Sequence, residues 1–170
     1  VKAMKKIFVG LIMLLSVSLV GCSKAEKVIN SEYISRMERL THDTIRNTEV
    51  YNEKYLDSEL VNEKYLGGKR DSYKDFADGL STFRTEDEEI NKLHDKIREV
   101  SLDLYNRINE KIELEGEQTK LYSKSDLTDE EEKRLKEIEK RQDELEDMLK
   151  NQEEHIGNIG YEISKKIGLE

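Results

Sequence analysis

Apolar residues recur at alternating spacings of three and four toward the end of the chain. This spacing puts one apolar side chain per turn on a single helix face, which is typical of a coiled-coil seam. The helix is predicted to begin at Thr128, because Thr128 and Glu131 fit a capping box. The seam positions are Leu135, Ile138, Gln142, Leu145, Leu149, Gln152, Ile156, Ile159 and Ile163. Of these, Gln142 and Gln152 either fix the register of the seam or lie exposed where the seam is loose.

A similar stripe of apolar residues lies directly before this helix. Thr85 and Glu88 fit a second capping box, so another helix is predicted to start there. Its seam positions are Ile90, Leu93, Ile97, Val100, Leu104, Ile108 and Ile112. The polar segment 123–126 interrupts the pattern. Because this connection is short, we expect an antiparallel coiled-coil hairpin over residues 86–167, with arms of about 35 residues or roughly 50 Å.

Helical spacing also runs through the region between residue 26 and this hairpin. It predicts one long helix over residues 26–66 and a shorter helix over residues 71–82. We expect a bend between them at Gly67-Gly68, since paired glycines weaken a helix and suit a turn. The chain has no proline to break its helices. The predicted fold class is therefore all-α: an elongated helical bundle with a long antiparallel coiled-coil hairpin in its C-terminal half.

Tyrosines are concentrated before the hairpin, at Tyr33, Tyr51, Tyr55, Tyr65 and Tyr73. Tyrosine combines a large apolar ring with a polar tip, so it suits either the core of a polar bundle or a partner-binding groove. The helical spacing of these residues favours the core. A groove would require Tyr51 and Tyr55 to be exposed.

The first 22 residues follow a different pattern. Lys5 and Lys6 precede an uncharged apolar run over residues 7–20, which Gly21 and Cys22 follow. A basic start, an apolar run and a small residue are the parts of a secretory signal peptide. A run of about 14 residues is shorter than the roughly 20 that a helix needs to cross a bilayer. We therefore predict a signal peptide over residues 1–21, with Met4 as an alternative first residue, and a mature helical domain over residues 22–170.

The segment Leu19-Val20-Gly21-Cys22 resembles the lipobox of bacterial lipoproteins. This resemblance implies cleavage between Gly21 and Cys22 by signal peptidase II, diacylglycerol on the Cys22 thiol and a palmitate-type acyl chain on the new amino terminus. It also implies attachment to the cell membrane on the side facing away from the cytoplasm. Cys22 is the only cysteine, and the alternative role for it is a free thiol or an intermolecular disulfide.

The charge of the chain limits its partners. The formal net charge is −9, and the predicted signal peptide would remove lysines but no acid. An acidic body is repelled by phosphate backbones and by anionic lipid head groups. We therefore exclude nucleic acid and electrostatic adsorption to a membrane. Self-association through the coiled coil is left as an option.

The sequence contains no recognisable catalytic, cofactor-binding or metal-binding motif. With lipid on Cys22, no thiol is left for nucleophilic catalysis or for a zinc site. His42, His94 and His155 lie far apart, and none follows a glutamate by three residues, as the di-iron helix-bundle motif requires. We interpret the three histidines as surface or interface residues. The chain is accordingly predicted not to be an enzyme and to bind no cofactor and no metal.

The anchor and the lack of catalytic motifs together predict a non-catalytic interaction protein with an envelope partner, either a protein or a cell-wall polymer. In its length, lipobox, charge-rich helices and final Lys165-Lys166-Ile167-Gly168-Leu169, the chain resembles the YkyA-type cell-wall-binding lipoproteins of Gram-positive bacteria. That resemblance implies binding to the wall. The alternatives are a phage or plasmid exclusion or immunity lipoprotein, an export chaperone with an exposed apolar groove, and an enzyme with an unrecognised site.

Overall fold

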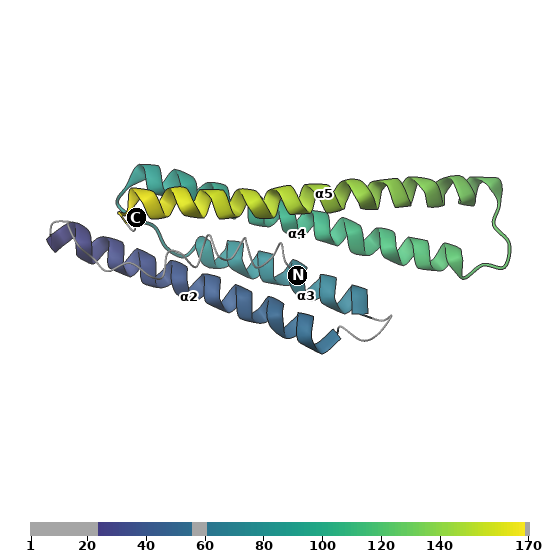
Figure 1. Ribbon diagram of the computed structural model, residues 1–170, viewed down its shortest axis with the longest axis horizontal. Coiled ribbons are helices and arrows are strands. Elements are labelled where there is room, and N and C mark those ends of the chain that lie inside the picture. The colour runs from purple at the N-terminus through teal and green to yellow at the C-terminus, as the bar shows by residue number, and fades with distance from the viewer. Residues whose placement is uncertain (1–23, 56–60, 169–170) are drawn as a thin grey trace.

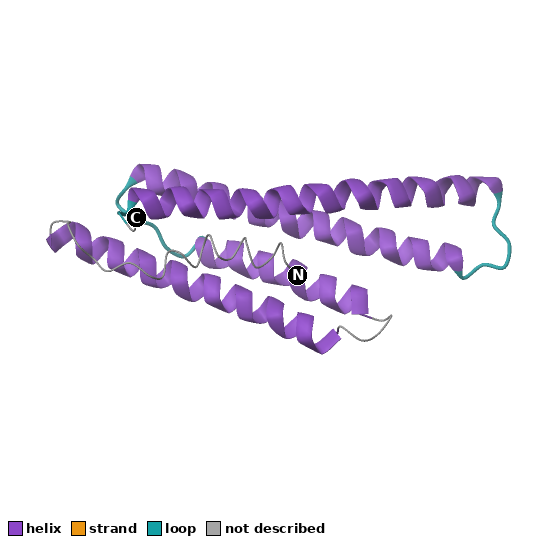
Figure 2. Cartoon of the chain, in the orientation of Figure 1, coloured by secondary structure: helices purple, strands orange, loops and turns teal. Residues whose placement is uncertain are grey.

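The computed structural model describes residues 24–55 and 61–168, which form four long helices (Figures 1 and 2). The helices are α2 (Lys24–Tyr55), α3 (Val61–Leu80), α4 (Glu88–Tyr122) and α5 (Asp129–Lys166). Within the described ranges the chain contains no strand. The predicted all-α fold class is confirmed.

Successive helices run in opposite directions along one elongated body (Figure 1). The start of α2, the α3–α4 connection and the end of α5 lie at one end of this body, which we call the base. Residues 123–128, which connect α4 to α5, lie at the other end, which we call the tip. The α4–α5 hairpin extends beyond α2 and α3 toward the tip. The predicted antiparallel hairpin is therefore present, and its outer part stands clear of the other two helices.

All four helices contribute to one apolar core in the inner part of the body. Its buried residues are Tyr33, Met37, Leu66, Tyr73, Phe76, Leu80, Phe83, Ile90, Leu93, Ile97, Leu104, Ile108, Leu149, Ile156, Ile159, Ile163 and Ile167. The predicted seams of both hairpin helices supply most of these residues. Tyr33 and Tyr73 are core residues, as the spacing favoured. The side chains of Tyr51 and Tyr55 lie outside the described residues.

A second, smaller apolar cluster lies toward the tip. It consists of Leu121, Leu135 and Ile138, with Leu114 and Leu127 packed against them. Gln142 Nε2 donates a hydrogen bond to Gln118 Oε1 across the seam at 3.2 Å. Gln142 is thus a half-buried, paired residue rather than one exposed at a loose seam. Gln152 likewise lies half-buried and donates to Asp103.

Ion pairs also join the two hairpin helices, α4 and α5. The Arg141 guanidinium donates to both carboxylate oxygens of Glu110, at 2.6 and 3.1 Å. The Arg134 guanidinium does the same to Glu117, with both distances at 2.8 Å. These bidentate pairs fix the relative position of the arms, although their exposure keeps the contribution of each to stability small.

The predicted bend at Gly67-Gly68 is wrong. Helix α3 runs through both glycines, and α2 ends at Tyr55 rather than at residue 66. Two interior glycines weaken a helix by about 1 kcal/mol each, but packing of the flanking Leu66 and Tyr73 into the core offsets this cost. The predicted helix bounds of 26–66 and 71–82 are therefore replaced by those of α2 and α3.

One of the two predicted capping boxes is correct. At α5, Thr128 Oγ1 accepts a hydrogen bond from the Glu131 backbone N–H, and the Glu131 carboxylate accepts one from the Thr128 N–H. At α4, however, the cap is Asp87 instead of Thr85, because the Asp87 carboxylate accepts from the N–H groups of Glu89 and Ile90 at 2.8 and 3.1 Å. A carboxylate at this position also interacts favourably with the positive end of the helix dipole, so Asp87 is the stronger cap.

Candidate functional site

The residue on which the predicted anchor depends precedes the first helix at the base. Cys22 and Gly21 lie outside the described residues, which begin at Lys24. In the sequence, Cys22 comes two residues before Lys24, the first residue of α2.

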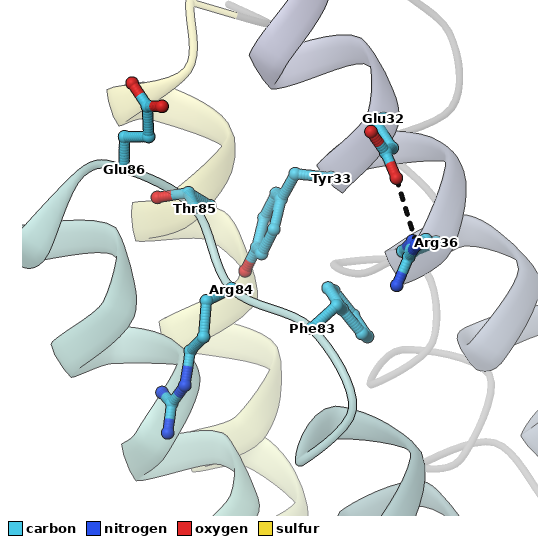
Figure 3. A pocket seen from close by; sticks show the side chains of 7 residues that line it. All are labelled: Glu32, Tyr33, Arg36, Phe83, Arg84, Thr85 and Glu86. Carbon is cyan, nitrogen blue, oxygen red and sulfur yellow. Dashed lines mark hydrogen bonds and ion pairs between the residues drawn. The ribbon is translucent and has the colours of Figure 1, made fainter.

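A surface hollow of about 370 Å³ lies at the base, between α2 and the α3–α4 connection (Figure 3). Its lining residues are Glu32, Tyr33, Arg36, Phe83, Arg84, Thr85 and Glu86. The Arg36 guanidinium lies 5.9 Å from the centre of the Phe83 ring and donates to Glu32 at 3.0 Å. Figure 3 shows Arg84 pointing away from this pair, and its guanidinium is held by Asp95. Both arginines of the hollow are thus already paired with carboxylates.

A buried hydrogen-bond network lies beneath the hollow and is centred on His94. Its Nε2 is 2.5 Å from the Leu80 carbonyl oxygen, and its Nδ1 is 3.1 Å from the Tyr33 hydroxyl. A carbonyl can only accept, so Nε2 carries the proton and Nδ1 accepts from Tyr33 in the neutral ring. The Phe83 ring packs edge-on against His94 with centroids 5.0 Å apart. We call Tyr33, His94 and the Leu80 carbonyl the His94 network; it joins α2, the end of α3 and α4.

The three histidines have different environments. His42 and His155 are exposed, in agreement with their interpretation as surface residues. His94 is fully buried, so it is not a surface residue. It lies next to Leu93 on the core side of α4 and reaches polar partners on two other elements. In the part of the chain that the structure describes, no group of three or more His, Cys, Asp or Glu side chains is arranged to hold a metal ion.

A second buried polar cluster was not predicted. Glu153 is 5% exposed, and its Oε1 accepts from Lys69 Nζ at 2.6 Å and from the Tyr73 hydroxyl at 2.8 Å. Burial, reinforced by the neighbouring Glu153 charge, raises the pKa of Tyr73 well above its usual value. The sequence does carry a signal for this cluster, since Glu153 follows Leu149 by four residues and precedes Ile156 by three. That spacing puts a carboxylate on the apolar face of α5.

The tip carries polar groups and one exposed aromatic ring. Tyr122 is 60% exposed, and its hydroxyl donates to Glu139 at 2.9 Å. In the α4–α5 connection Lys124 pairs with Glu131. The Lys124 ammonium, helped by the Thr128 backbone N–H, lowers the pKa of Glu131 to about 2. The tip is therefore an ordered, water-facing surface that a partner can reach.

None of the described helices is both long enough and apolar enough to cross a membrane. No protein-family model, curated protein or solved structure matches this chain. Its function therefore has to be inferred from its own residues and geometry.

Proposed function

We propose that this chain is a lipid-anchored protein of the bacterial cell envelope that binds its partner without catalysing a reaction. Lipid on Cys22 holds the base at the outer face of the cell membrane. The α4–α5 hairpin then points away from the membrane and presents the tip to an envelope protein or a cell-wall polymer.

The main support for this proposal is that Cys22 comes two residues before α2 in the sequence, and that α2 starts at the end of the body opposite the tip. The cysteine of the lipobox precedes the base end of α2, whereas the α4–α5 connection lies at the opposite end of the body (Figure 1). At 1.5 Å per residue, the hairpin arms span roughly 50 Å. A tether at one end and an exposed surface at the other is the geometry expected of a protein that reaches from a membrane to a partner.

Physical chemistry also favours lipid as the only contact with the bilayer. Each buried methylene of an acyl chain contributes about 0.8 kcal/mol, so two or three chains hold a protein firmly whereas one does not. The chain is acidic, with a formal net charge of −9 over its 170 residues, and is repelled by anionic head groups. The helices therefore stay in water while the acyl chains stay in the membrane.

The hairpin is better suited to binding than to chemistry. Several of its side chains are joined in pairs, such as Arg134 with Glu117 and Tyr122 with Glu139. Such paired groups hold a surface in one shape, which lowers the entropy lost when a partner binds. A pull-down on purified peptidoglycan distinguishes the two partner classes: retention identifies the wall polymer, and failure to bind leaves an envelope protein.

Substitution of the anchor residue tests the proposal. We expect the parent chain to incorporate labelled palmitate and to lack residues 1–21, whereas Cys22→Ala incorporates none and keeps them, because Cys22 provides the only thiol in the chain for diacylglycerol. Intact mass and label incorporation are measured on protein from the membrane fraction. The matched control, Ser23→Ala, should behave as the parent does. Equal processing of Cys22→Ala and the parent would show that Cys22 is not a lipid anchor.

A further inference from the structure

The His94 network joins three elements through a single titratable ring. The ring is fully buried, and both of its nitrogens are already engaged, one as donor to the Leu80 carbonyl and one as acceptor from Tyr33. A second proton on the ring would convert Nδ1 into a donor. The oxygen of the Tyr33 hydroxyl would then have to accept a hydrogen bond from Nδ1. The phenol proton would need a new acceptor at a side chain that is only 2% exposed. The arrangement of these hydrogen bonds therefore favours the neutral ring.

The surroundings of the His94 ring also favour its neutral form. The pKa of His94 lies below its usual value, chiefly because burial removes the ring from water, and the Arg84 and Arg98 cations lower it further. The Leu80 carbonyl and Asp95 oppose this shift, but the Asp95 carboxylate is already paired with Arg84. Helix α2 contributes the Tyr33 phenol, and in the described residues α5 adds no charged group to this set.

The His94 network connects helix α2 to α4 through the hydrogen bond between the Tyr33 hydroxyl and His94 Nδ1. Between residues 31 and 47, where its side chains are described, its buried apolar residues are Tyr33 and Met37, and Ile34 and Leu40 are partly buried against the same core. Thr41 is also buried, and its hydroxyl has no hydrogen-bond partner in the structure. By contrast the shorter α3 buries Leu66, Tyr73, Phe76, Ala77 and Leu80. An element with few buried apolar contacts is the first to separate from a body when one contact is lost.

We infer that the His94 network is a pH-sensitive contact that holds α2 on the α3–α4–α5 body at neutral pH and releases it in acid. In the released state His94 faces water and takes up a proton near pH 6.5, the usual value for histidine. Stability contributed by the neutral ring is fully present above that pH and is lost as the pH falls toward the lower pKa of the docked state. This inference does not depend on lipid at Cys22.

Distances between spin labels on α2 and α4 test this inference. The protein is the full-length chain in detergent micelles with Cys22→Ala, so that Asp43→Cys and Lys96→Cys, both at exposed positions, are the only thiols. Double electron–electron resonance is recorded between pH 7.5 and 5. We expect one short distance at pH 7.5 and a second, longer distance in acid. Because one proton is taken up, the ratio of the two populations should change by at most tenfold per pH unit.

Two variants separate His94 from other titrating groups. His94→Gln keeps one donor and one acceptor but does not titrate, so its distances should not change with pH. His42→Gln with His155→Gln, at two exposed positions, should leave the pH response as in the parent, and this variant keeps the test valid if His94→Gln does not fold. An unchanged distance distribution in the parent, a response that persists in His94→Gln, or a response lost in the double variant would each overturn the inference.

Discussion

Lys69→Met should lower the free energy of unfolding by about 3 kcal/mol or more, because it leaves the buried Glu153 carboxylate without its cation. Lys69 and Glu153 have side-chain exposures of 13% and 6%, and their atoms lie 2.6 Å apart. The Tyr73 hydroxyl still donates to Glu153, but a neutral donor does not replace a charge. The midpoint of urea unfolding, followed by circular dichroism, measures the loss.

The same helix offers a matched control for this substitution. Lys74 pairs with Asp78 at 2.8 Å, but both side chains are about half exposed, so Lys74→Met should change the unfolding free energy by no more than about 0.5 kcal/mol. Adding Glu153→Leu and Tyr73→Phe to Lys69→Met should restore most of the loss, since an apolar replacement of a whole buried pair is often neutral. If Lys69→Met costs no more than Lys74→Met, Glu153 is not a buried charge that depends on Lys69.

Leu104→Ala should destabilise the whole body by about 2–5 kcal/mol, whereas Ile138→Ala should loosen only the tip. Both side chains are fully buried, but Leu104 belongs to the core that all four helices share and Ile138 to the small cluster near the tip. The two clusters have no residue in common. Shortening the Ile138 side chain therefore removes contacts of the tip cluster and none of the main core.

Hydrogen exchange, measured peptide by peptide, distinguishes these two outcomes. In Ile138→Ala we expect faster exchange over residues 114–138 and unchanged exchange over residues 90–104, because cooperative units open separately. In Leu104→Ala exchange should accelerate in all the described helices. Acceleration at the base in Ile138→Ala as large as at the tip would mean that the body opens as one unit.

The hairpin is predictable from sequence because its signals are local and repeated. Helix α5 begins after Thr128, as its capping box predicts, and the seam residues from Leu135 to Ile163 lie against α4. A spacing of three and four sustained over many turns specifies a buried helix face almost independently of what it packs against. The polar residue Gln142 belongs to the same face and is satisfied by Gln118 from the opposite arm.

Features that depend on contacts between distant segments were not predictable. The Gly67-Gly68 pair resembles a turn, yet packing around Leu66 and Tyr73 keeps it helical. His94 and Glu153 are polar residues in a charge-rich sequence, where exposure is the ordinary expectation. Each is buried because its partners come from other helices: Tyr33 for His94, and Lys69 with Tyr73 for Glu153. The spacing of Glu153 from Leu149 and Ile156 places its carboxylate on the apolar face of α5, but no local pattern identifies the partners on the other helices.

The orientation of the body on a membrane tests the central proposal most directly. The lipidated protein is reconstituted in vesicles that contain an acceptor dye, and a donor is attached at Ser125→Cys in the tip or at Glu86→Cys at the base, both at exposed positions. With lipid on Cys22, the introduced cysteine is the only free thiol. The proposal predicts strong energy transfer from the base and weak transfer from the tip. Equal transfer from both positions would contradict a hairpin that points away from the membrane.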